Sequence, residues 1–153
     1  MASELSFYDT FLELQWAGLN LSGADIRVAL LTDAYTFAAT HADYAAVLAS
    51  GTGIELATGD GYTAGGALIP DISVDVTGDP KATVLSGGNV TWSALTATFR
   101  YALYYIDGVQ GGITDPVLCC VLLDDTPANI VVSGIDYMLL HSESGIFSSG
   151  VIA

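Results

Sequence analysis

The longest run of alternating side chains extends from Leu95 to Ile106, and it constrains the fold more than any other feature of the chain. Its odd-numbered positions are apolar or aromatic, whereas its even-numbered positions begin polar, with Thr96 and Thr98, and end apolar. Successive side chains of a β-strand point to opposite faces of the sheet, so the pattern predicts one long strand with one packed face. The change along its second face predicts a strand that begins in solvent and ends under a neighbouring element.

Turn residues recur along most of the remaining chain. Clusters of Gly, Asn, Asp and Pro return every 8–15 residues and separate short runs with β character. Regularly spaced short strands of this kind are typical of a sandwich or barrel. We therefore predict a mainly β fold with a single β-sandwich or jelly-roll-like domain over residues 1–153, whose β-rich body covers about 25–152.

Two segments near the N-terminus have helical rather than strand character. Over about 4–17, Phe7, Phe11 and Leu14 recur at the spacing of one helix face, which predicts an N-terminal α-helix packed across the sheet. Residues 41–49 precede a Ser-Gly-Thr-Gly turn, and we expect a short second helix there.

Composition indicates that some of the surface is covered by another protein. Hydrophobic residues make up 52% of the chain and charged residues 13%, whereas a typical soluble domain has about 25% charged residues. The longest apolar run, Val117–Leu123, has seven residues, and a membrane-spanning helix needs about 20. We therefore expect no membrane insertion, and we expect apolar surface to be buried against copies of the chain or another partner.

The charge of the chain narrows the choice of partner. Three basic residues stand against 17 acidic ones, which gives a formal net charge of −14. A protein that binds nucleic acid needs clustered Lys and Arg to neutralise phosphates, so we predict no nucleic-acid partner. An anionic membrane surface would also repel the chain. The acidic residues are expected to face solvent and to limit unspecific association.

The sequence shows no arrangement of residues that is typical of a catalytic site. His41 and His141 are the only imidazoles, and no Gly-x-Ser-x-Gly motif accompanies them. The glycines at 59–66 lack both the Gly-Lys-Ser/Thr of a phosphate loop and the strand–turn–helix context of a dinucleotide site. We predict that the protein is not an enzyme and binds no cofactor.

Acidic residues in predicted turns leave a calcium site open. Asp107, Asp115, Asp124 and Asp125 could meet at one end of a sandwich, and calcium binds carboxylate oxygens. The EF-hand pattern is absent, however, and Asx turns explain aspartate at the same positions.

Other residues of chemical interest receive structural interpretations. Cys119 and Cys120 are adjacent, so in a strand they point to opposite faces and are expected to be buried thiols rather than a disulfide. The glycines of the segment 62–66 predict a bend where two backbones come close.

Arg100 interrupts the apolar part of the longest strand, and we predict a structural cation paired with a carboxylate or with backbone carbonyls. The eight tyrosines invite a carbohydrate-binding interpretation, but core and interface packing is preferred.

Six segments, spread over nearly the whole chain, carry a family resemblance. They are Phe7–Leu12, Ile26–Thr32, Gly61–Gly66, Val90–Ser93, Ala97–Tyr105 and Pro116–Leu118. In this order they resemble a family of small virion structural proteins of tailed bacteriophages. Where that family usually has an Asp-Phe-Gly-like turn, this chain has Leu122-Leu123-Asp124-Asp125.

The resemblance implies a non-enzymatic component present in many copies in the virion. We expect a capsid decoration or cement protein that binds the outer capsid surface, stabilises the head and is made in the host cytoplasm. Its expected partners are the major capsid protein and copies of itself, and a homotrimer is expected because cement proteins often occupy threefold positions of a shell. A tail or neck subunit is the alternative, followed by a carbohydrate- or receptor-binding module.

The candidate interface combines the aromatic N-terminal helix with the bend at residues 62–69. Phe7, Tyr8 and Phe11 are expected to contribute from the helix, and Tyr62 and Leu68 from the bend. We expect this apolar patch to meet the shell while the acidic surface faces solvent.

Overall fold

The computed structural model describes residues 4–77, 82–124, 126, 128–141 and 146–150. The protein is mainly β, with 46% strand and 10% helix, which confirms the predicted class. The helices are α1 (Asp9–Trp16) and α2 (Tyr44–Leu48). The strands are β1 (Glu4–Phe7), β2 (Ile26–Leu31), β3 (Ala67–Leu68), β4 (Ser73–Thr77), β5 (Ala82–Ser86), β6 (Val90–Phe99), β7 (Tyr101–Ile106), β8 (Val109–Gln110), β9 (Ile113–Thr114), β10 (Val117–Leu122), β11 (Ile130–Leu139) and β12 (Phe147–Gly150).

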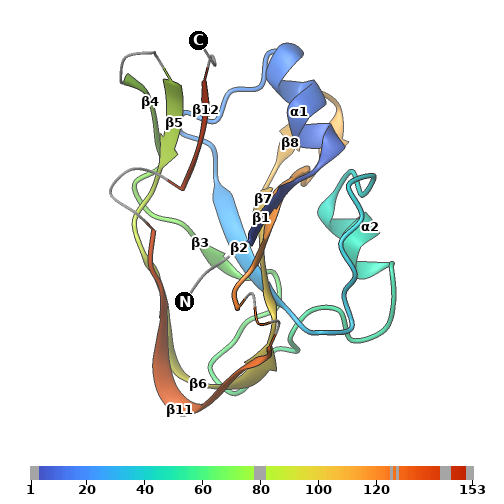
Figure 1. Cartoon of the computed structure of the whole chain (residues 1–153), viewed down its shortest axis with the longest axis vertical. Coiled ribbons are helices and arrows are strands. Elements are labelled where there is room, and N and C mark those ends of the chain that lie inside the picture. The colour runs from blue at the N-terminus through green and yellow to red at the C-terminus, as the bar shows by residue number, and fades with distance from the viewer. Residues whose placement is uncertain (1–3, 78–81, 125, 127, 142–145, 151–153) are drawn as a thin grey trace.

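A five-stranded antiparallel sheet occupies the middle of the molecule, with strand order β1-β10-β7-β2-β3. Figure 1 shows α2 on one side of this central sheet, and β4, β5, β12 and the β6–β11 pair on the other. The arrangement is sandwich-like: both faces of the sheet are covered, but one cover is a helix with its flanking loops and the other is made of strands.

Two hydrophobic cores lie on the two faces of the central sheet. The core on the α2 side includes Val47 of α2 together with Leu103 and Tyr105 of β7. The core on the other side includes Trp92 of β6 and Tyr104 of β7. We call the first the α2-side core and the second the strand-side core. Because consecutive β7 residues point into different cores, this strand is apolar on both faces, as strands buried on two sides are.

The N-terminal helix is shorter than predicted, and the prediction of a helix over 4–17 is wrong at its start. Glu4–Phe7 is strand β1, which pairs with β10, and α1 begins only at Asp9. Pairing with the edge of the central sheet gives these residues backbone partners that a first helical turn would lack. Phe7 therefore stacks on Phe11 from the strand, with ring centroids 5.5 Å apart, instead of from the preceding helical turn. The second helix is present as α2, with Asp43 as its N-cap.

The predicted strand 95–106 is two strands that belong to different sheets. β6 pairs with β11, whereas β7 pairs with β2 and β10. The strand is interrupted between them, at Arg100. In β6 the odd-numbered Leu95 and Phe99 enter the strand-side core, whereas in β7 the even-numbered Tyr104 enters it. The packed face thus shifts by one residue at Arg100, as expected where a strand passes between sheets at a bend.

The predicted close approach of two backbones around residues 62–66 is confirmed. Gly66 has φ +75° and packs so tightly on β2 that a Cβ atom would lie 2.0 Å from the carbonyl oxygen of Val28. Gly61 has φ +89° and packs in the same way against the backbone of residues 93–95 in β6. Only glycine fits both the space and the left-handed conformation at these positions.

Candidate functional site

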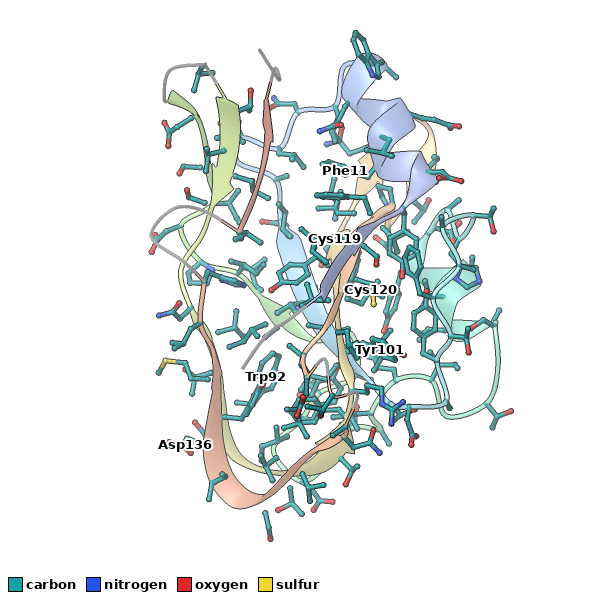
Figure 2. All side chains as sticks on the ribbon, viewed as in Figure 1. Phe11, Trp92, Tyr101, Cys119, Cys120 and Asp136 are labelled. Atoms are coloured by element: carbon teal, nitrogen blue, oxygen red, sulfur yellow. The ribbon has the colours of Figure 1, made fainter. Side chains whose placement is uncertain are left out.

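The predicted interface residues do not form a shared surface patch. Tyr8, Phe11 and Tyr62 are buried, which corrects the expectation that they face a partner. Phe7 is half-buried, and only Leu68, at 48% exposure, lies largely in solvent. Figure 2 shows Phe11 below α1, directed into the molecule. The aromatic rings fill the two cores, and a sequence pattern does not separate an aromatic core face from an aromatic binding face.

Tyr8 begins a polar chain inside the α2-side core. Its hydroxyl lies 2.7 Å from the hydroxyl of Tyr35, which in turn lies 3.1 Å from Nδ1 of His41. Burial raises the pKa of Tyr8 far above its ordinary value, and it raises the pKa of Tyr35 to about 12. Both phenols therefore stay protonated near neutral pH, and their hydrogen bonds hold the segment before α2 on the central sheet.

Tyr62 belongs to a second polar cluster, which is centred on the carboxylate of Glu55. This carboxylate accepts hydrogen bonds from the Tyr62 hydroxyl at 2.6 Å, from the backbone N–H of Gly65 at 2.7 Å and from the Tyr44 hydroxyl. The ring of Tyr44 stacks on Tyr105 with centroids 4.5 Å apart and an interplanar angle of 12°. The cluster joins α2, the 62–66 bend and β7. Sequence reasoning missed Glu55, because a lone glutamate gives no sign of three distant donors.

Arg100 has a different partner from the one predicted. Its Nε donates to Oδ1 of Asn129 at 2.8 Å, and Nδ2 of Asn129 donates to Oδ2 of Asp33 at 3.0 Å. Within the described residues, which do not include Asp125 and Pro127, this direct partner is an amide, and neither a carboxylate nor a backbone carbonyl accepts from the Arg100 side chain. The ion pair of the described residues joins Arg27 and Asp107, 2.7 Å apart.

His141 and the turn aspartates have structural partners. Nδ1 of His141 donates to the carbonyl of Gly88 at 2.7 Å, which leaves Nε2 to accept from the Tyr104 hydroxyl at 2.8 Å. Burial lowers the pKa of His141, so the ring is neutral near pH 7. Asp115 accepts from the backbone N–H of Gly108.

The calcium interpretation gains no support from the part of the chain that the structure describes. Asp124 accepts from Thr126, and Asp107 is paired with Arg27. Asp125 lies outside the described residues. No group of three or more His, Cys, Asp or Glu side chains that could hold a metal ion is found among the residues described. Cys119 and Cys120 are free, buried and directed into different cores, as predicted.

We call the pair of strands β6 and β11 the ribbon. Exposed apolar side chains are concentrated on its strand β11. Of the ten large hydrophobic side chains exposed in the described chain, four lie on β11 or directly after it, and they are Val131, Ile135, Met138 and Leu140. Val131 lies opposite Thr98 and Met138 opposite Thr91. Both threonines are exposed, so Val131 and Met138 share the outer face of the ribbon.

The free edge of β11 adds to this surface. Within the described residues, β11 has β6 as its one strand partner, so its other edge is left without a strand to pair with. Asp136 is the only charged residue of the two strands, and Figure 2 shows it on the outer side of β11. The ribbon is therefore an apolar, nearly uncharged edge on a strongly acidic protein.

Trp16, the last residue of α1, is the most exposed large hydrophobic side chain among the described residues, at 94%. It borders a pocket of about 540 Å³ between the end of α1, the turn that follows and the β4–β5 pair. This pocket and the ribbon are the two surfaces best suited to binding another molecule.

Comparison with known proteins gives no match: no family model, no curated protein and no solved structure is similar to this chain. None of the described helices is long and apolar enough to cross a membrane.

Proposed function

We propose that the protein is a non-enzymatic structural protein of a bacteriophage virion, a decoration or cement protein that binds the outer capsid surface and stabilises the head. The order of six sequence segments supports membership of such a family. The observation that carries the proposal is the concentration of four exposed apolar side chains within residues 131–140, on β11 of the ribbon and directly after it. A nearly uncharged edge strand of this kind needs a cover, and the shell or a neighbouring copy would supply it.

The acidic remainder of the protein has a complementary role in this proposal. A net charge of −14 keeps free subunits apart and soluble, while the ribbon carries only Asp136. Attachment then depends on apolar burial and on main-chain hydrogen bonds to the edge of β11. Binding of this kind persists in high salt, because screening weakens ion pairs and leaves hydrophobic contacts in place. The proposed partners are the major capsid protein and copies of this chain, with a homotrimer as the proposed free form.

Labelling of intact virions tests the location directly. Antibody-bound gold over the heads supports a decoration protein, and gold restricted to the tail shaft or neck would assign the protein to the tail instead. Sedimentation equilibrium of the free protein tests the homotrimer, and a monomer at all concentrations would remove that part of the proposal.

Ribbon variants test the surface. We expect Val131→Lys combined with Met138→Lys to abolish binding to purified capsids, because two charges would have to be desolvated in the contact. Val76→Lys combined with Val109→Lys is the matched control, since these valines of β4 and β8 are similarly exposed but lie outside the ribbon. Equal loss of binding in the control would contradict a role specific to the ribbon.

A further inference from the structure

The exposure of Trp16 is unusual for a side chain of its size. A tryptophan ring usually buries about 150–250 Å² of surface in a core or an interface, yet 94% of Trp16 is accessible to solvent. The other tryptophan, Trp92, is buried in the strand-side core with 5% exposure. An exposed ring next to a pocket offers a flat surface on which another molecule can stack.

The pocket beside this ring has a mixed and uncharged lining among the described residues. Gln15, Asn20, Ser22 and Thr83 contribute amide and hydroxyl groups, and three aliphatic side chains from the turn and from β4 contribute apolar surface. Its volume of about 540 Å³ falls within the range of roughly 300–1,000 Å³ found for small-molecule sites. A purely apolar partner would leave these amides and hydroxyls without hydrogen bonds, so the pocket favours a ligand that is itself polar.

The turn that forms one wall of the pocket is held in place by the backbone. Gly18 has φ +91°, and the N–H of Leu19 donates to the carbonyl of Leu14 at 2.9 Å, the bond of a Schellman ending of α1. The N–H of Ser22 donates to Oδ1 of Asn20 at 3.0 Å, which orients the carboxamide of Asn20. The carboxamide of Asn20 is thus positioned before any ligand arrives, which reduces the entropy lost on binding.

Charge selects among polar ligands. The C-terminal end of a helix is partly negative, α1 has no basic residue in its last turn, and the chain carries a net charge of −14. An anionic ligand is therefore repelled. The same charge would attract a cation, but the described lining offers no carboxylate to pair with it.

From these observations we propose that Trp16 and the adjoining pocket bind a neutral saccharide. One face of a sugar ring is made of C–H groups and stacks on the indole, while its hydroxyls exchange hydrogen bonds with the amides and hydroxyls of Gln15, Asn20, Ser22 and Thr83. The carbohydrate interpretation of the sequence rested on tyrosines, most of which are buried; the structure assigns it to a different aromatic residue. This site does not depend on the proposed role in the virion.

Tryptophan fluorescence tests the proposal, because the chain has only two tryptophans. In Trp92→Phe the emission comes from Trp16 alone. We expect neutral hexoses, N-acetylhexosamines and their disaccharides, added one at a time, to shift this emission to shorter wavelength and to protect it from acrylamide. Dissociation constants of roughly millimolar size are expected from an open site of this kind. Isothermal titration of the unmodified protein gives the same test without any substitution in the core.

Variants locate the binding. Trp16→Ala should abolish it, and Asn20→Ala should weaken it about tenfold, the loss expected for one hydrogen bond to a polar ligand. Leu12→Ala is the control, because Leu12 is an exposed residue of the same helix outside the pocket lining, and it should bind as the unmodified protein does.

Three results would overturn the proposal. The first is that no neutral sugar protects Trp16 or releases heat. The second is that N-acetylneuraminic acid, a charged sugar, binds at least as tightly as the neutral ones. The third is that Trp16 becomes protected as protein concentration rises without any sugar, which would show that the ring contacts a second copy of the chain.

Discussion

The central sheet and the ribbon share one continuous run of sequence, β6 followed by β7, yet the two regions differ in how their strands are buried. β7 is buried on both faces, and two of its own tyrosines, Tyr104 and Tyr105, have hydrogen-bonded hydroxyls. β6 and β11, by contrast, have one face in the strand-side core and the other in solvent. The change occurs at Arg100, whose N–H donates to the carbonyl of Leu31 at the end of β2. Stability is therefore expected to reside in the sheet, and surface for partners in the ribbon.

The largest expected loss of stability comes from a change in the 62–66 bend, which packs against β2 of the central sheet. Gly66→Ala should destabilise the protein by roughly 4 kcal/mol or more, because its Cβ would overlap the backbone of Val28 in β2. Gly65→Ala is the matched control: Gly65 also has a positive φ, but its Cβ would meet only the Tyr105 hydroxyl, at 3.7 Å. It should cost about 1–2 kcal/mol from backbone strain alone. Urea unfolding of both variants measures the difference, and equal losses would show that the close approach is unimportant.

One leucine in each region gives the next comparison. Leu103 lies fully buried in β7, and Leu140 is exposed directly after β11. Leu103→Ala should lower the free energy of unfolding by about 2–5 kcal/mol through lost burial and a new cavity, whereas Leu140→Ala should change it by no more than about 0.5 kcal/mol. Thermal or urea unfolding provides the measurement. A large loss in Leu140→Ala would mean that the end of β11 is covered even in the isolated protein.

Local pattern predicted the fold class better than it predicted the boundaries or the site. Alternation and turn spacing identified the mainly β fold, because both follow from the backbone geometry of strands. They could not show that Glu4–Phe7 pairs with β10, since that pairing depends on residues more than a hundred positions away. The interruption at Arg100 was not predicted for the same reason. The apolar alternation continues past it, but the partner strands change.

The functional surfaces were harder to predict than the fold. Phe11 and Trp16 are both aromatic residues of α1, and only packing against distant strands makes the first buried and the second exposed. The bend at residues 62–66 was predicted correctly, because consecutive glycines outside a repeat directly indicate a constraint on the backbone. The role of Glu55 was not predicted, because its three hydrogen-bond donors come together only after folding.

High pH should weaken the central sheet through its buried tyrosines. Burial raises the pKa of Tyr105 to about 12 from an ordinary value of 10. The unfolded chain therefore loses this proton first, so the stability is intact below pH 10 and falls between about pH 10 and 12. The slope is about 1.4 kcal/mol per pH unit for each such tyrosine. Urea unfolding at pH 9, 10 and 11 should show this decline, and Tyr105→Phe should reduce its slope by one tyrosine. An unchanged slope would mean that the Tyr105 phenol titrates normally in the folded protein.

The smallest effect compares one exposed aspartate from each region. Asp107 follows β7 and pairs with Arg27 across 2.7 Å, but both side chains are more than one-third exposed. Asp107→Asn should therefore cost only about 0.2–1 kcal/mol, and the loss should disappear in 1 M salt, where charges are screened within a few ångströms. Asp136 of the ribbon instead accepts a hydrogen bond from the backbone N–H of Ala94 at 2.9 Å. Asparagine keeps that acceptor oxygen, so Asp136→Asn should leave stability nearly unchanged at any salt concentration. A salt-independent loss in Asp107→Asn would show that the contact with Arg27 acts through hydrogen-bond geometry more than through charge.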